Sequence, residues 1–304
     1  MSNLQSSIGS TRELTPTREL TPDQLEWRDA EGTRFAVYRW QQAVTSGDTS
    51  LVLVHGHGEH MARYSSFVRR LNVPISVIGY DQRGHGLSDG ARGDAVGIDQ
   101  LADDLNDILP FLLRETNASR CIVFGHSMGG LIVARFLTNA NSDTSSIRAA
   151  AISAPAFHVH KTPLIRLKIA VGRLAARLWP TLTFATGLDS TAISRDPAVI
   201  EDYRKDPLVH DKISARFGRS LIDDGEATAA KGHLVRVPIL IYHGTADRIA
   251  AIDGTEKFAA GVSSSLAQFR KLPGYYHEPH HEPSPDSDEV FTFLRSWILS
   301  QLAR

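Results

Sequence analysis

The sequence predicts an α/β fold with a mostly parallel central sheet flanked by helices. From Leu51 onward, short β-branched apolar runs alternate with longer amphipathic stretches, the pattern of parallel strands buried on both faces and joined by helices. The chain has 304 residues, of which 42% are hydrophobic and 22% charged, a composition that can bury a large globular core. The single cysteine, Cys121, excludes a disulfide-stapled scaffold and a structural zinc site built on paired thiolates.

Charge and hydropathy narrow the class of protein further. The formal net charge of -1 provides no global attraction to nucleic acid, so we expect no nucleic-acid partner. The polar N-terminal stretch contains TRELTP twice, at 11–16 and 17–22, and we expect residues 1–24 to form a flexible tail. We find neither a signal peptide nor a run of about 18 apolar residues able to span a membrane. We therefore expect a cytoplasmic protein, with peripheral membrane association left open.

Six apolar runs are the expected strands, and two amphipathic stretches stand out as helices. The strands are residues 51–54, 75–80, 121–124, 149–153, 239–242 and 268–272. A helix follows the second strand, with Asp99 as its expected cap and with Pro110 expected to kink or end it. Its apolar face consists of Leu101, Leu105, Ile108, Leu109 and Leu112. The face of the last helix consists of Val290, Leu294, Trp297 and Ile298.

The alternation of strands and helices is interrupted once. It stops after Ala154 and resumes near Val237, and the stretch between looks helical and loop-like without strand runs. A stretch of this length between two buried strands exceeds an ordinary connection. We expect residues 25–155 and 231–304 to form the core, and residues 156–230 a helical cap inserted after the sixth strand of the fold. Because active sites of such sheets lie at the carboxyl ends of the strands, the cap is expected to cover the site.

A nucleophile candidate follows the third expected strand. Residues 125–129 read Gly-His-Ser-Met-Gly, the G-x-S-x-G pattern, and the apolar residues after them predict the start of a helix. In this context a sharp strand-to-helix turn exposes Ser127, and the flanking glycines avoid steric collisions. The backbone N–H of Met128 then lies at the helix start, where a developing oxyanion is stabilised.

A serine nucleophile needs a base and an acid that orients the base. In the α/β-hydrolase fold the order along the chain is serine, acid, histidine. Asp247 and His277 follow the two last expected strands in that order. Taken singly, each has an equally good interpretation as a turn aspartate or a surface-loop histidine. Order and strand context together favour the catalytic interpretation.

A second oxyanion donor is expected from an early loop. The first strand runs into HGHG at 55–58, which resembles the HG-rich segments that supply a backbone N–H in lipases and esterases. We assign this donor to His57. The alternative is an ordinary glycine turn.

Taken together, these segments resemble the monoglyceride lipase and lysophospholipase branch of the α/β-hydrolase superfamily, from residue 25 to the C-terminus. The core motifs are HGHGEH at 55–60, RY at 63–64, YDQRGHGLSDG at 80–90, GHSMGG at 125–130, GTADR at 244–248 and YHE at 276–278. The cap phrases, which make the resemblance specific, are LDS at 188–190, SRD at 194–196 and DPL at 206–208.

The resemblance implies a catalytic triad of Ser127, Asp247 and His277, with the N–H groups of His57 and Met128 as oxyanion hole. It also implies that a polar pocket for a glycerol-like alcohol, opposite an apolar acyl tunnel, is lined by Glu59, Arg63 and His280. Two departures stand out: His57 replaces the alanine that relatives often carry, and cysteines near the pocket are missing. We therefore expect thiol-directed inhibition to be weak.

The activity we expect is hydrolysis of a small-molecule lipid ester, monoacylglycerol first, without cofactor or metal. Alternatives are a lysophospholipase, a short- or medium-chain carboxylesterase, acyl transfer to another alcohol, and a catalytically inactive binding module. Residues 277–281 also fit the zinc-binding pattern H-E-x-x-H, but Pro279 and the prolines after it disfavour the required helix.

Residues 163–180 form a basic amphipathic segment of the cap. Its apolar stripe is Leu164, Leu167, Val171, Leu174 and Leu178, with arginines elsewhere around the helix. Such a helix either packs its stripe on the core or touches an anionic lipid surface. Oligomeric state is left open.

Overall fold

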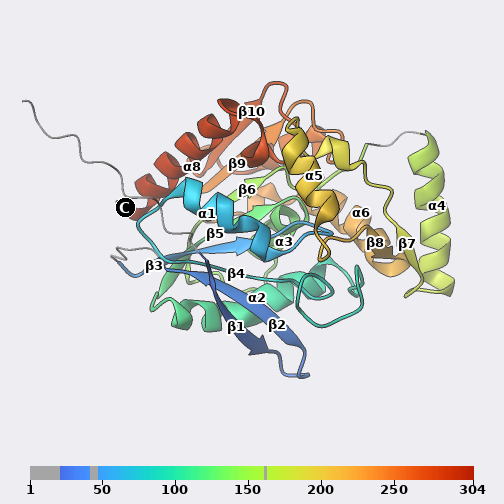
Figure 1. Ribbon diagram of the computed structural model, residues 1–304, viewed down its shortest axis with the longest axis horizontal. Coiled ribbons are helices and arrows are strands. Elements are labelled where there is room, and N and C mark those ends of the chain that lie inside the picture. The colour runs from blue at the N-terminus through green and yellow to red at the C-terminus, as the bar shows by residue number, and fades with distance from the viewer. Residues whose placement is uncertain (1–20, 42–46, 161–162) are drawn as a thin grey trace, which may run out of the picture.

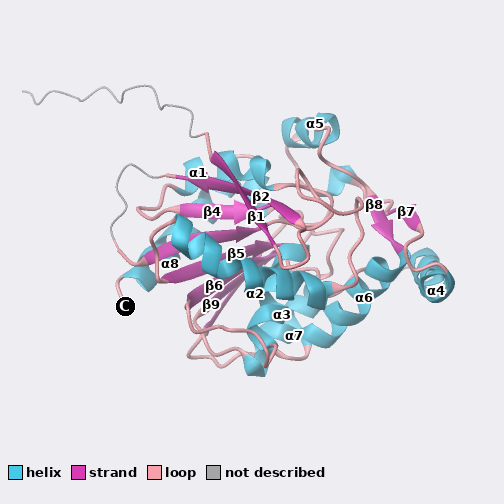
Figure 2. Ribbon diagram, turned by 90° about the horizontal axis from the view of Figure 1, so that it is seen from below, coloured by secondary structure: helices cyan, strands magenta, loops and turns pink. Residues whose placement is uncertain are grey.

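The structure, a computed structural model, describes residues 21–41, 47–160 and 163–304. Within them a central sheet carries helices on both faces (Figures 1 and 2), and its strand order is β1-β2-β4-β3-β5-β6-β9-β10. The strands are β1 (Asp23–Arg28), β2 (Arg34–Trp40), β3 (Thr49–Val54), β4 (Val77–Tyr80), β5 (Arg120–His126), β6 (Ile147–Ser153), β9 (Ile239–Gly244) and β10 (Ala267–Leu272). The pairs from β4 across to β10 are parallel, whereas β2 pairs antiparallel with β1 and β4. The expected mostly parallel α/β fold is confirmed.

All six expected strands are present. β3, β4 and β9 are buried along their whole length, as sheets covered on both faces require. Neither β1 nor β2 was predicted from the sequence, because β1 is an edge strand in which polar residues flank the half-buried Leu25 and Trp27, and arginines interrupt the apolar residues of β2. The tail expected to reach residue 24 was two residues too long, since β1 begins at Asp23. Residues 1–20 of that expectation lie outside the described residues.

Helices cover the two faces of the sheet and form two hydrophobic cores. Leu51 and Leu53 of β3 belong to the core shared with α1 (Ser65–Leu71) and α8 (Asp286–Leu302). Val52 and Val54, which point to the opposite face, belong to the core shared with α2 (Ile98–Glu115), α3 (Met128–Thr138) and α7 (Ile252–Gly261). The expected apolar face of α8 is buried.

The helix α2 corrects two expectations. It runs unbroken through Pro110, and its apolar residues on both sides of the proline are buried. Packing of this face outweighs the lost backbone hydrogen bond. The N-terminal cap position is held by Gly97 rather than Asp99, whose carboxylate instead pairs with Arg135.

The chain between β6 and β9 gathers at one end of the sheet (Figures 1 and 2). It comprises α4 (Pro163–Leu178), β7 (Thr183–Ala185), α5 (Pro197–Lys205), β8 (Lys212–Ser214) and α6 (Ala215–Ala229). The expectation of a stretch without strands was wrong, because β7 and β8 pair antiparallel. At three residues each, these strands are too short to give a periodic signal.

The amphipathic helix α4 turns its apolar stripe outward. Leu167, Val171, Leu174 and Leu178 are 53–63% exposed. The contact with α6 is made instead by small buried side chains, Ala175 and Ala176 against Ala215. The alternative that the stripe packs on the core is therefore wrong for these four residues. The side chain of Leu164, the fifth residue of the stripe, lies outside the described part. In the described chain, no helix is both long and apolar enough to cross a bilayer.

Candidate active site

Ser127 occupies the turn between β5 and α3. Its backbone has φ 53° and ψ -118°, a region that L-residues rarely adopt and that marks stored strain. The two flanking glycines are required sterically. A Cβ on Gly125 would lie 2.4 Å from the carbonyl oxygen of Gly129, and one on Gly129 would lie 2.1 Å from that of Val54. The strand-turn-helix expected from the sequence is confirmed.

The structure brings the other two expected residues to this serine. His277 follows β10, and its Nε2 lies 2.8 Å from Ser127 Oγ. Asp247 follows β9, and its Oδ2 lies 2.7 Å from His277 Nδ1. Because a carboxylate only accepts, Nδ1 carries the proton and donates it, which leaves Nε2 free to accept from the serine hydroxyl.

Electrostatics at Asp247 and His277 favour this arrangement. Burial opposes the charge of Asp247, but His277 and His243 outweigh it and hold the pKa of the carboxyl far below its ordinary range. Burial likewise opposes a charged His277, yet the Asp247 carboxylate raises the pKa of this imidazole above its ordinary value of 6.5. The acid therefore stays ionised, and the base is stabilised when it takes up a proton.

His243 is a residue to which the sequence analysis gave no role. Its Nε2 lies 3.0 Å from Asp247 Oδ2 and 3.2 Å from the carbonyl oxygen of Ala250, while its Nδ1 lies 2.8 Å from Thr255 Oγ1. Two acceptors at Nε2 place the proton there, so Nδ1 accepts from the Thr255 hydroxyl. The N–H groups of Ile249 and Ala250 donate to Asp247 Oδ1 at 2.7 and 3.0 Å.

The loop after β3 lies against the serine. A Cβ on Gly56 would lie 3.2 Å from Ser127 Cβ, and Gly56 and His57 line the same cavity as Ser127. The Gly56 N–H donates to Glu59 Oε1 at 2.6 Å, and Glu59 is buried. Met128 is the first residue of α3, so its N–H has no partner within the helix. The two expected oxyanion donors therefore belong to segments that meet at Ser127.

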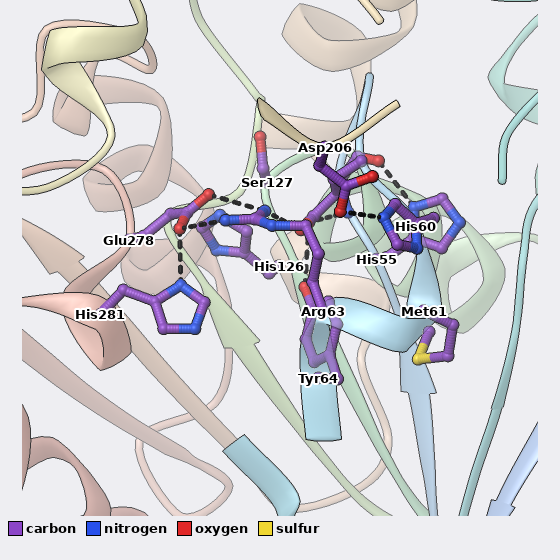
Figure 3. A network of polar contacts seen from close by, with 12 residues as sticks. His55, His60, Met61, Arg63, Tyr64, His126, Ser127, Asp206, Glu278 and His281 are labelled. Carbon is purple, nitrogen blue, oxygen red and sulfur yellow. Dashed lines mark hydrogen bonds and ion pairs between the residues drawn. The ribbon is translucent and has the colours of Figure 1, made fainter. Parts of the chain in front are cut away.

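The three residues expected to bind substrate take different positions relative to the cavity. Glu59 lines the cavity, whereas Arg63 lies beside it, between two carboxylates. Arg63 Nη1 is 2.5 Å from Glu59 Oε2, and its two terminal nitrogens lie 3.2 and 3.1 Å from the oxygens of Glu278 (Figure 3). His280 is 1% exposed and packs against aromatic rings, including Phe67 at 5.3 Å between ring centroids.

The cavity around Ser127 has a volume of about 40 Å³ and is walled by both the core and the segment between β6 and β9. Its polar wall includes Tyr203 and Glu278, and its apolar wall includes Leu188, Ile193 and Ile249. The sequence did not predict that these five residues line the cavity. Glu278 stood beside the histidine in the quoted motif, but Tyr203 reaches the site only through the packing of α5.

The histidine-rich loop offers one group of metal-ligand type. Ligand atoms of Glu278, His280 and His281 lie within 4.8 Å of one another. Both Glu278 oxygens are already bonded, to Arg63 and to His281 Nδ1 at 2.6 Å, so a divalent ion would have to displace a cation. The H-E-x-x-H interpretation does not fit, because His277 bonds Ser127 and Asp247, and 279–281 form only a single 3₁₀ turn.

Known proteins resemble this chain over most of its length. Residues 46–284 match the family described as "Serine aminopeptidase, S33". A monoacylglycerol lipase of Mycolicibacterium smegmatis is 32% identical over 256 residues, covering 83% of this chain and 88% of that protein.

Solved structures show the same architecture. The crystal structure of Paleococcus ferrophilus monoacylglycerol lipase superposes with a TM-score of 0.75 at 30% identity, covering 87% of this chain and 99% of that one. A soluble variant of the Saccharomyces cerevisiae monoglyceride lipase, in complex with a substrate analogue, gives a TM-score of 0.83 at 23% identity, with 95% and 99% covered. The chain belongs to the serine aminopeptidase S33 family of α/β-hydrolases, in its monoglyceride lipase branch.

Proposed function

We propose that this protein hydrolyses monoacylglycerol to glycerol and a fatty acid, with Ser127, His277 and Asp247 as the catalytic triad. Ser127 Oγ attacks the ester carbonyl carbon while His277 Nε2 takes the hydroxyl proton. Asp247 keeps the imidazole in its Nδ1–H tautomer and stabilises the imidazolium that forms. The observation that carries the proposal is the pair of contacts of 2.8 and 2.7 Å that join the three side chains.

The tetrahedral intermediate places negative charge on the former carbonyl oxygen. The N–H groups of His57 and Met128 donate to this oxygen. When the intermediate collapses, the ester C–O bond breaks and the glycerol oxygen takes the proton from His277, which leaves an acyl group on Ser127. Water then attacks the acyl carbon while His277 takes its proton, the bond from this carbon to Ser127 Oγ breaks as Oγ receives the proton from His277, and the fatty acid departs.

The choice of substrate rests on the walls of the cavity and on the relatives. Leu188, Ile193 and Ile249 provide apolar contact for an acyl chain, and Glu59 and Glu278 provide acceptors for the hydroxyl groups of an alcohol. The M. smegmatis relative is itself a monoacylglycerol lipase. A cavity of about 40 Å³ holds only about one or two water molecules, so residues 156–230 act as a cap that must move to admit the chain.

The triad is tested with Ser127→Ala, which removes the nucleophile. We expect it to abolish both ester turnover and labelling by a fluorophosphonate, because no other group can form the acyl-enzyme. The purified enzyme is also compared on monoacylglycerols of graded chain length, lysophosphatidylcholine and p-nitrophenyl esters. A variant that keeps turnover and labelling contradicts the triad. A preference for lysophosphatidylcholine replaces monoacylglycerol lipase by lysophospholipase.

We further propose that the cap contacts lipid surfaces through α4. The exposed apolar face, continued by Trp179 at 62% exposure, suits insertion into an interface. Leu174→Asp is expected to reduce co-sedimentation with vesicles while p-nitrophenyl acetate hydrolysis stays unchanged. Binding that is unaffected by this substitution contradicts the contact.

A further inference from the structure

Two buried carboxylates line the cavity beside the nucleophile, and a single guanidinium joins them. Glu59 and Glu278 are 4% and 3% exposed. Arg63 donates to both, with a bidentate contact to Glu278 at 3.2 and 3.1 Å. Two carboxylates thus share one guanidinium, and Glu278 also accepts from His281 Nδ1 at 2.6 Å.

Neighbouring groups favour the charged forms of Glu278 and Arg63. Burial opposes the ionised form of Glu278, but Arg63 and the hydrogen bond from His281 outweigh it and hold the pKa of the carboxyl well below its ordinary value. The two carboxylates in turn outweigh burial and raise the pKa of Arg63. The guanidinium is also covered by the ring of Tyr203, which lies 4.8 Å away. Arg63 is therefore already engaged by anions of the protein itself.

We propose that Glu278 selects the leaving alcohol by charge, so that the enzyme accepts uncharged or cationic alcohols and rejects those that carry a phosphate. This inference rests on the proposed hydrolase function. Hydroxyl groups of glycerol can donate hydrogen bonds to a wall of carboxylate acceptors. A phosphate carries negative charge and mostly accepts, so a wall built on two carboxylates in a poorly solvated site repels it.

The test uses three esters with the same acyl chain and alcohols of different charge. They are 1-monopalmitoylglycerol, 1-palmitoylglycerol 3-phosphate and palmitoylcholine. For the wild-type enzyme we expect kcat/KM on the phosphate ester to be at least about 100-fold below that on the glycerol ester, because like charges repel strongly in a poorly solvated site.

Glu278→Gln keeps the shape of the side chain and removes its charge. We expect kcat/KM to rise about tenfold for the phosphate ester and to fall about tenfold for the choline ester, and to fall for the glycerol ester as well, because its hydroxyl groups lose one carboxylate acceptor. Opposite changes on two substrates cannot come from partial unfolding, which lowers all three rates together. Glu278→Asp retains the charge and is expected to retain the wild-type ratios.

The matched control is Glu201→Gln, which removes the same charge from α5. Glu201 has a side chain 63% exposed and pairs only with Lys205 within its own helix among the contacts of the described chain. We expect its substrate ratios to equal those of the wild type. A wild-type enzyme that cleaves the phosphate and glycerol esters equally well, or a Glu278→Gln enzyme slowed equally on all three, overturns the inference while leaving the hydrolase function intact. A wild-type enzyme that cleaves none of the three contradicts the proposed function itself.

Discussion

At Asp247 a single carboxylate oxygen serves two histidines. Oδ2 lies 2.7 Å from His277 Nδ1 and 3.0 Å from His243 Nε2, and Oδ1 accepts from two backbone N–H groups. A carboxylate with this many donors has little freedom to rotate, so the orientation of His277 is set by residues that never touch the substrate. His243 and Thr255 are positioning residues in this sense, because they act through Asp247.

The pH dependence of kcat/KM reports on this arrangement. In the proposed mechanism neutral His277 is the base, and its pKa is raised above 6.5, so activity is expected to fall as the pH drops through a value above 6.5. His243→Leu removes one donor from Oδ2, which leaves more negative charge to stabilise the His277 imidazolium. We expect the acid limb to move to higher pH and kcat to fall about tenfold. The measurement is kcat/KM from pH 5 to 9.

The control for this experiment is His243→Gln, whose amide N–H can still donate toward Asp247. It is expected to restore most of the wild-type profile. If His243→Leu lowers the melting temperature but leaves the acid limb where it was, His243 only fills space.

Some functional residues could be predicted from the sequence and others could not, for physical reasons. Ser127, Asp247 and His277 could be found because each follows a recognisable strand, and parallel strands bring their carboxyl ends to one edge of the sheet. Tyr203 could not, since it lies on a cap helix whose placement depends on tertiary packing. The pairing of Arg63 with Glu278 likewise joins residues distant in the chain, and no local pattern records it.

At the scale of elements, the turn at Ser127 depends on close backbone contact between β3, β5 and α3. Gly129→Ala places a Cβ 2.1 Å from the Val54 carbonyl oxygen, a backbone atom that cannot move aside without shifting β3. We expect this change to displace the N–H of Met128 and to lower kcat by about 100-fold or more, the cost of one lost oxyanion donor. Ester turnover and the melting temperature measure the effect.

Gly172→Ala provides the matched control on another helix. A Cβ there meets nothing within 4 Å, and Gly172 lies in the interior of α4. Alanine is a better helix former by about 1 kcal/mol, so this variant is expected to be slightly more stable with unchanged p-nitrophenyl acetate hydrolysis. A Gly129→Ala enzyme as active as Gly172→Ala contradicts the steric argument.

Periodicity predicts that an element exists more reliably than it predicts what the element contacts. The helical spacing in α2 and α4 was correct in both cases, yet the α2 stripe is buried and the α4 stripe is exposed. The helix α2 also shows why Pro110 did not end it, because residues buried on both sides keep the helix packed. The strand β1 was missed because an edge strand with an exposed face carries a weak apolar signal, and β2 because arginines interrupt its apolar residues.

At the scale of the whole molecule, several histidines near the site lie buried or half-buried. Burial lowers the pKa of each, to about 3 for His55 and for His57. The described residues with such lowered histidine pKa values are His55, His57, His85, His126, His210 and His280. Several of these rings contact one another, with 4.8 Å between the centroids of His85 and His210, so charging one disfavours charging its neighbours.

This burial predicts marked acid lability of the folded state. Below about pH 6.5, the ordinary pKa of histidine, these side chains bind protons in the unfolded chain but not in the folded chain. The free energy of unfolding therefore falls by up to about 1.4 kcal/mol per pH unit for each histidine. His277 acts in the opposite direction, because its pKa is raised in the folded state. Its contribution to the free energy of unfolding is fully present below pH 6.5 and is lost as the pH rises through the folded-state pKa. Because several groups act in the first direction and one in the opposite direction, the free energy of unfolding is expected to decrease as the pH falls below 6.5.

Urea unfolding at pH 8, 7, 6 and 5 measures the effect, and His57→Gln isolates one contributor. The amide of a glutamine side chain does not titrate, so the variant is expected to lose stability less steeply, by up to about 1.4 kcal/mol per pH unit between pH 6 and 5. Glu201→Gln, on the exposed surface of α5, should keep the wild-type slope. A free energy of unfolding that stays constant from pH 8 to 5 contradicts the prediction, since it requires these histidines to bind protons as readily in the folded chain as in the unfolded one.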